Sequence, residues 1–409
     1  MSVATTVAQP TPQNSSVSFI APTELGHAER LARLRLARSQ NVGPRTFHHL
    51  LRRFGSAEQA VDALPSLAAR GGKRDYEVCP REVALAELER GDKLDCRLLI
   101  AGDAGYPTLL AELEPAPPLL WVMGRFELLE ESAVALVGAR NASALGLRTA
   151  RRLARELGVN GHVIVSGMAR GIDAAAHEAA LATGTVAVLA GGLDKPYPAE
   201  NLALYDRLTS EGALVSEIPF GIEPTSRHFP RRNRLISGLA RGVVLVEAAI
   251  RSGSLITARF ALEQGREAMA CPGAAEDPRA AGCNSLIREG AALIRHAGDV
   301  DDALSAPRTL GLAEGGRDFE FDADMFGEDT MRDDYEALAD FDEEGDIGDE
   351  ALGEQILGLL GPHPVEIDEI ARECGASASE LSLAILELDL AGKVSIQPGG
   401  LIALNLNNE

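Results

Sequence analysis

Residues 133–177, AVALVGARNASALGLRTARRLARELGVNGHVIVSGMARGIDAAAH, contain two short apolar runs, each followed by a glycine turn and a helical pattern. The first run spans 133–137, and apolar residues at helical spacing follow it over 143–157. The second run spans 163–165, and a helical pattern follows it over 172–182. Short continuous apolar runs that alternate with helices are typical of parallel strands buried on both faces.

The same alternation continues toward the C-terminus. Further apolar runs occur at 186–189, 214–215, 243–246, 267–271 and 292–294. We therefore expect an α/β fold with a Rossmann-like, doubly wound, mostly parallel sheet. Ligands of such sheets bind at the carboxyl ends of the strands. The preceding stretch, which is rich in proline, predicts a connector with short strands.

Small modules flank the sheet on both sides. The pattern before it predicts short helices and a turn at 41–44, as in a helix-hairpin-helix module. Such a turn can hold a DNA phosphate, or the module can serve only for packing against a partner. Three helical patterns after 350, followed by KVSIQPGGLIAL at 393–404, predict a winged helix. The acidic face of these last helices favours protein interaction or regulation over DNA binding.

These patterns predict five segments along the chain. They are a disordered N-terminus at 1–27, a helical module at 28–96, a Rossmann-like domain at 97–305, an acidic linker at 306–350 and a winged-helix domain at 351–409.

The net charge of −22 mostly reflects one acidic tract. Residues 314–350 contain 17 acidic and two basic residues, so the rest of the chain carries only −7. This tract is either a solvated tether or an internal mimic of nucleic acid. The five cysteines form no CxxC pair, which fits a reduced, cytoplasmic compartment without disulfides or a structural metal. We expect neither a signal peptide nor a membrane span.

One basic segment contrasts with this acidity. Residues 224–246, PTSRHFPRRNRLISGLARGVVLV, contain five arginines, one histidine and one phenylalanine but no acid. Arginine forks pair with phosphates, and an aromatic face stacks on a base. The segment therefore predicts a site for a polyanion.

Several strand-to-helix turns predict anion-binding sites beside this segment. VGARNASALG at 137–146 departs from the dinucleotide fingerprint because Arg140 replaces its second glycine. SGMARGIDAAAH at 166–177 and SGS at 252–254 also open helices after strands. The nearby Asp173 and His177 suggest a hydrolase, but helical spacing gives no triad geometry, so a buried structural histidine is favoured.

In their order along the chain, GARNASALG, SGMARGIDAAAH, GGLDKPYPAEN, HFPRRNRLISGLA, SGSLITA and GCNSLIREGA resemble the DprA (Smf) family of DNA-processing proteins. The resemblance covers about residues 98–300. It implies a protein of natural transformation that binds single-stranded DNA, protects incoming DNA and loads the RecA recombinase. It also implies a homodimer. We expect no cofactor, no metal and no enzymatic activity, because the histidines and cysteines show no ligand spacing and no general base is paired with a nucleophile in the motifs.

The resemblance implies that specific residues of this chain contact DNA. They are Gly138, Arg140, Ser166, Gly167, Phe229, Arg231, Arg232, Asn233, Arg234, Ser252, Gly253, Ser254 and Asn284. Ala139 stands where the family has Ser or Thr, which puts one hydroxyl contact in doubt. The long acidic tract is a further departure.

Two enzyme classes remain as alternatives. A nucleotide-processing enzyme of the related Rossmann-like superfamily would show PGGxGTxxE, but the corresponding strand end reads EAAIRSGSLITA at 247–258. A dinucleotide oxidoreductase is disfavoured by Arg140 and by the lack of a suitably placed ribose-binding acid.

Overall fold

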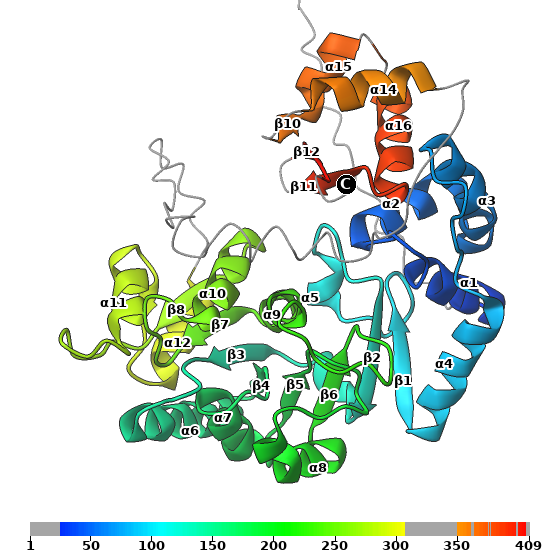
Figure 1. The fold of residues 1–409 in the computed structure, drawn as a ribbon. Helices are drawn as coiled ribbons and strands as arrows, with labels where there is room; N and C mark the ends of the chain where they lie inside the picture. Colours follow the sequence, from blue (N-terminus) through cyan, green and yellow to red (C-terminus); the bar gives the residue numbers. More distant parts are fainter. Residues whose placement is uncertain are drawn as a thin grey trace, which may run out of the picture.

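The computed structural model describes residues 25–306, 350–360, 364–374, 376, 378–397 and 400–405 (Figure 1). The predictions for residues 1–24 and for the acidic tract at 314–349 lie outside these ranges. Within them, no helix is both long enough and apolar enough to cross a bilayer.

A nine-stranded sheet forms the centre of the chain, in the order β1-β2-β6-β5-β4-β3-β7-β8-β9. The strands are β1 Cys96–Ile100, β2 Leu119–Gly124, β3 Ala133–Val137, β4 Val163–Ser166, β5 Thr185–Val188, β6 Ala213–Ser216, β7 Gly242–Leu245, β8 Glu267–Ala270 and β9 Ala292–Leu293. The seven strands from β6 to β9 are parallel, which confirms the predicted fold class. Strand order reverses between β3 and β7, so the ligand crevice of a doubly wound sheet is expected there.

Helices cover both faces of this sheet (Figure 1). On one face lie α6 Ala144–Val159, α7 Ile172–Ala180, α8 Leu202–Glu211 and α12 Ala297–Ser305. On the other lie α5 Thr108–Ala111, α9 His228–Gly238, α10 Gly253–Glu263 and α11 Ala281–Arg288. Every residue of β3 is buried, which explains the continuous apolar run AVALV. Two short 3-10 turns, Phe126–Leu129 and Ala199–Asn201, complete this domain.

The first two strands were predicted only as short strands in a connector. Instead they extend the large sheet, since β1 pairs antiparallel with β2, and β2 pairs antiparallel with β6. This edge carries Trp121, which is buried under helix α4 (Arg81–Lys93) and donates a hydrogen bond to Glu87 at 2.7 Å. The edge therefore connects the sheet to the N-terminal module.

The N-terminal module contains α1 His27–Ala37, α2 Pro44–Phe54, α3 Ala57–Arg70 and α4 Arg81–Lys93. The predicted turn joins α1 to α2, and Phe47 and Leu50 are fully buried behind it. The C-terminal domain contains α14 Glu350–Leu359, β10 Val365–Glu366, α15 Ile367–Cys374, α16 Ala378–Leu390, β11 Val394–Gln397 and β12 Leu401–Leu404. Three helices with an antiparallel wing confirm the predicted winged helix.

Candidate nucleic-acid interface

The predicted motifs meet at the carboxyl edge of the parallel strands. The first turn follows β3, the second follows β4, and SGS at 252–254 follows β7 and begins α10. Residues 228–238 of the basic segment form α9, which packs along α10. This edge contains an exposed outer layer and a buried inner layer.

The outer layer contains an arginine and two aromatic rings. The Arg140 guanidinium carbon lies 5.1 Å from the centre of the Phe229 ring, although roughly ninety residues separate them in sequence. The ring centres of Tyr197 and Phe229 are 5.8 Å apart, with the planes inclined at 59°. Arg140 is exposed and Tyr197 is 51% exposed, so both are available to a ligand. The motif GGLDKPYPAEN at 191–201 contains Tyr197, but the sequence analysis did not single out this residue.

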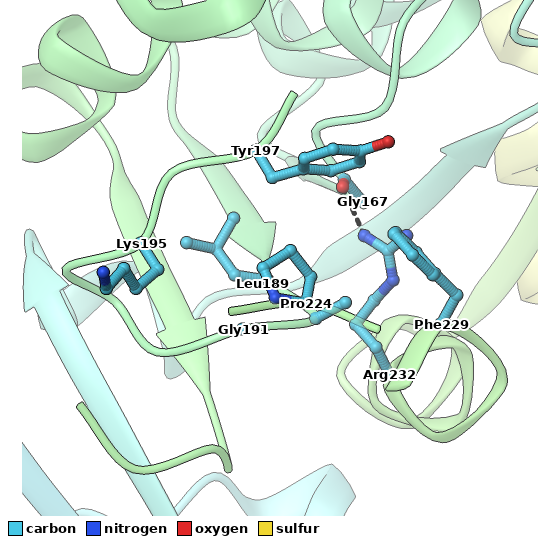
Figure 2. A pocket seen from close by; sticks show the side chains of 9 residues that line it. Gly167, Leu189, Gly191, Lys195, Tyr197, Pro224, Phe229 and Arg232 are labelled. Atoms are coloured by element: carbon cyan, nitrogen blue, oxygen red, sulfur yellow. Dashed lines mark hydrogen bonds between the residues drawn. The ribbon is translucent and has the colours of Figure 1, made fainter. Parts of the chain in front are cut away.

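A small hollow lies beside this aromatic pair (Figure 2). It is lined by Gly167, Leu189, Ala190, Gly191, Lys195, Tyr197, Pro224, Phe229 and Arg232. Figure 2 shows the rings of Tyr197 and Phe229 at one side and Lys195 at the other. The hollow thus combines apolar walls, stacking surfaces and a cation.

The inner layer is organised around Gly167. The buried Arg232 donates hydrogen bonds to the carbonyls of Gly167 and, at 2.7 Å, Val188. The Asp173 carboxylate accepts hydrogen bonds from the amides of the same turn, from Gly167 at 3.1 Å and from Ala169 at 3.3 Å. A Cβ atom at position 167 would lie 2.2 Å from the Arg232 guanidinium, so only glycine fits there. The Gly167 amide is therefore used inside the protein.

Burial sets the charge states of this inner layer. Burial raises the pKa of Asp173, and the positive charge of Arg232 opposes that rise. Burial lowers the pKa of Arg232 to about 10, with Asp173 acting against it. The guanidinium still stays charged at neutral pH. Arg232 therefore holds the turn after β4 rather than facing solvent.

His177 belongs to the same buried layer. Its Nδ1 lies 2.7 Å from the Thr185 hydroxyl oxygen. The Thr185 hydroxyl itself donates a hydrogen bond to the Ile164 carbonyl at 2.6 Å. Nδ1 must then carry the ring proton. Burial, assisted by Arg232, lowers the pKa of His177 to about 3, so the ring is neutral. The Ser166 hydroxyl donates to the Leu136 carbonyl, so it does not point to His177 as in a hydrolase triad. His177 is buried as predicted, and its purely structural role stays a prediction.

The N-terminus of α6, predicted to bind an anion, already holds Glu247. The Glu247 carboxylate accepts a hydrogen bond from the Ser143 amide at 3.2 Å and another from the Ser143 hydroxyl at 2.8 Å. The Glu247 carbonyl accepts the Ala139 amide at 2.6 Å. Both ends of the loop that carries Arg140 are therefore attached to one residue. A Cβ at Gly146 would lie 1.9 Å from the carboxylate, so the Glu247 side chain lies directly against the first turn of α6.

Sequence reasoning missed this role of Glu247. The available signal was an acid directly after the buried strand VVLV, facing a glycine turn that lacks a dinucleotide fingerprint. Gly138 packs against the same residue, since a Cβ there would lie 2.9 Å from the Glu247 carbonyl and 2.7 Å from Ile172.

The N-terminus of α10 is open by comparison. Ser252 accepts the Ser254 amide at 3.4 Å, and a Cβ at the exposed Gly253 would meet no atom within 4 Å. Asn233 donates to the Gly253 carbonyl at 3.3 Å and so connects α9 with α10. In the part of the chain that the structure describes, no carboxylate accepts a hydrogen bond from this terminus.

The other residues predicted to contact DNA also divide into exposed side chains and side chains that are bonded inside the protein. Arg231 is exposed. Arg234 instead forms an ion pair with Glu217 at 2.5 Å, with both side chains mostly buried. Asn284 uses both atoms of its side-chain amide on the backbone of Gly273, each at 3.1 Å. Contact of any of these residues with DNA stays a prediction.

No metal site accompanies this interface in the described ranges, where no group of three or more His, Cys, Asp and Glu residues is suited to an ion. The geometry instead offers cations, stacking rings and the open start of α10 at Gly253.

Three family models match this chain. The model of DNA recombination-mediator protein A matches residues 97–305, that of a DprA-like N-terminal HHH domain matches 27–89, and that of a DprA winged helix domain matches 344–400.

Individual relatives agree with these matches. Protein Smf of Escherichia coli is 37% identical over 75% of this chain and 77% of its own length. Protein Smf of Synechocystis is 30% identical over 92% of this chain and 98% of its own. The crystal structure of DNA processing protein A from Streptococcus pneumoniae superposes with a TM-score of 0.56 at 34% identity, covering 68% of this chain and 98% of that one.

Proposed function

The chain belongs to the DprA (Smf) family of DNA-processing proteins, and on this premise we propose that it binds single-stranded DNA at the carboxyl edge of its sheet. The observation that carries the proposal is the exposed Arg140 beside the Phe229 ring. A guanidinium pairs with phosphate, and a ring face stacks on any base that is not already stacked in a duplex.

We assign different roles to the two layers of the edge. Arg140, Phe229, Arg231, the Gly253 amide and the hydroxyls of Ser252 and Ser254 contact the DNA. The buried or internally bonded residues hold these contacts in position; they are Gly138, Ser166, Gly167, Arg232, Arg234 and Asn284, together with Asn233 at the α9–α10 junction. Tyr197 and Lys195 extend the contact surface into the hollow beside Phe229.

The family resemblance also supports a more specific biological role. We propose that the protein protects incoming DNA in the cytoplasm during transformation, acts as a homodimer and passes the strand to the RecA recombinase. The match of residues 97–305 to the recombination-mediator family supports the last step. The segment bounds at 28–96, 97–305, 306–350 and 351–409 remain part of this proposal.

We further propose that the protein is not an enzyme. At the start of α6, where a related nucleotide-processing enzyme would hold a phosphate, the Glu247 carboxylate already accepts hydrogen bonds from the Ser143 amide and hydroxyl. Incubation with a panel of nucleoside phosphates, followed by chromatography, should give no product. Product in stoichiometric excess that disappears with Asp173→Asn or His177→Gln would support the enzyme alternative.

A salt titration tests the DNA proposal directly. Affinity for a single-stranded oligonucleotide should exceed that for the duplex of the same sequence, with little sequence preference. The logarithm of the binding constant should fall with the logarithm of salt concentration by about 0.7 per contacted phosphate. Equal affinity for single strands and duplex would contradict the proposal.

A further inference from the structure

Helix α16 of the winged helix is apolar on two faces. Leu381, Ile385 and Leu388 face the domain's own core. Leu386 and Leu390 instead belong to the core of the N-terminal module and are 1% and 0% exposed. A helix that is apolar on opposite faces is one buried between two partners. Figure 1 shows α16 beside α2 and α3.

Polar contacts reinforce this packing around the α1–α2 turn. Asn41 donates to the Leu390 carbonyl at 2.9 Å, and the Thr46 hydroxyl donates to the Asp389 carboxylate at 2.8 Å. Arg45 extends the contact to the wing by donating to the Gln397 carbonyl at 2.6 Å. These side-chain donors of the turn and of the start of α2 are therefore bonded to oxygens of the winged helix.

The backbones themselves come close at the end of α3. A Cβ at Gly71 would lie 2.0 Å from the Glu387 carbonyl and 2.9 Å from the Ala391 side chain. The φ angle of Gly71 is −72°, so lack of space, not backbone strain, restricts this position. Arg70 forms an ion pair with Glu387 at 3.0 Å beside it.

The charge of α16 does not suit DNA. Its sequence ASELSLAILELDL contains three acids, Glu380, Glu387 and Asp389, and no lysine or arginine. A helix that reads the major groove approaches a dense row of phosphates, and cations supply most of that affinity. The third helix of a winged helix is the position at which such a reading helix would be expected.

From the two apolar faces, the hairpin contacts and the charge, we infer that this winged helix is a protein-docking module. Its third helix and wing hold the N-terminal helical module of the same chain, and DNA is not its ligand. DNA binding is left to the sheet edge.

Full-length protein with Gly71→Gln tests the inference, because a side chain at 71 collides with α16. Gly26→Gln is the matched control, since a Cβ there meets nothing within 4 Å and φ is −63°. Hydrogen exchange of residues 378–390 should rise at least tenfold with Gly71→Gln and stay unchanged in the control. Affinities for single-stranded and duplex oligonucleotides should both stay within twofold of the wild-type protein.

Each other outcome contradicts the inference. Unchanged exchange means that this contact does not hold α16. A tenfold gain in duplex affinity means that docking masks a reading helix, and a loss of single-strand affinity means that the docked domains contribute to DNA binding. If Gly71→Gln does not fold, Arg70→Glu replaces it in the same assays. Its increase in exchange should be reversed by adding Glu387→Arg.

Discussion

Arg231 and Arg232 are adjacent in the chain but belong to different layers of the sheet edge. Arg231 is exposed, whereas Arg232 is 6% exposed and bonded to two backbone carbonyls. The difference arises because successive residues of α9 point about 100° apart. One basic motif therefore supplies both a ligand surface and the framework beneath it. Changes to the two layers should affect different measurements.

The largest effect is expected for Arg232→Met. It leaves Asp173 without its neighbouring positive charge and removes two hydrogen bonds to buried carbonyls. Removing one member of a buried charged set costs about 3–5 kcal/mol of unfolding free energy. Arg231→Met is the matched control and should change stability by no more than about 0.5 kcal/mol. Urea denaturation measures both, and equal losses would erase the distinction between the layers.

The fold was largely predictable because buried parallel strands have continuous apolar sequences. The run AVALV and the glycine turn after it locate β3 and the start of α6 to within about a residue. The antiparallel β1–β2 edge was not predictable as part of the sheet. Its strands lie in a proline-rich stretch, and their neighbour β6 comes roughly ninety residues later than β2.

The site was predictable as a set of motifs but not as two layers. Ser166 and Gly167 follow a strand, as phosphate-binding turns do, yet Ser166 is fully buried and bonded to β3. Which residues of 228–238 face outward depends on where α9 begins, and apolar spacing does not locate that start in a basic segment. Long-range contacts such as Glu247 with Ser143 have no local signature.

The pH dependence of stability gives a second measure of the inner layer. The pKa of His177 is about 3 in the folded protein and ordinarily 6.5, so below pH 6.5 only the unfolded chain takes up this proton. Stability should then fall with decreasing pH by about 1.4 kcal/mol per pH unit until pH 3. Asp173, whose pKa is raised by burial, acts in the opposite direction. The difference between wild type and His177→Gln isolates the histidine; parallel pH profiles would contradict its buried, neutral state.

Substitutions in the outer layer should lower the affinity for single-stranded DNA rather than the stability of the fold. Arg140→Ala should weaken single-strand binding by about 1.5–3 kcal/mol, the usual scale of a charge-assisted contact. Phe229→Ala should cost about 1–3 kcal/mol through lost stacking, with a smaller change in salt slope. Neither change should much lower the melting temperature, because Arg140 is exposed and Phe229 is only half-buried. Lower melting with unchanged affinity per folded molecule would assign both residues to the framework.

The smallest effect is expected where the layers join, at Glu247. Glu247→Ala frees both the Ser143 amide and its hydroxyl, so the loop that carries Arg140 loses one of its two attachments. Residues that act through one another couple by about 0.5–3 kcal/mol, and an indirect effect on affinity belongs near the lower end, about 1 kcal/mol. Glu247→Gln keeps an oxygen for Ser143 and should bind single strands nearly as well as wild type.

In the Arg140→Ala background, Glu247→Ala should cause no further loss of affinity, because the loop then carries no contact to misplace. Titrations of the two single variants and the double variant measure this coupling. An equal penalty in both backgrounds would mean that Glu247 supports the whole edge rather than positioning Arg140.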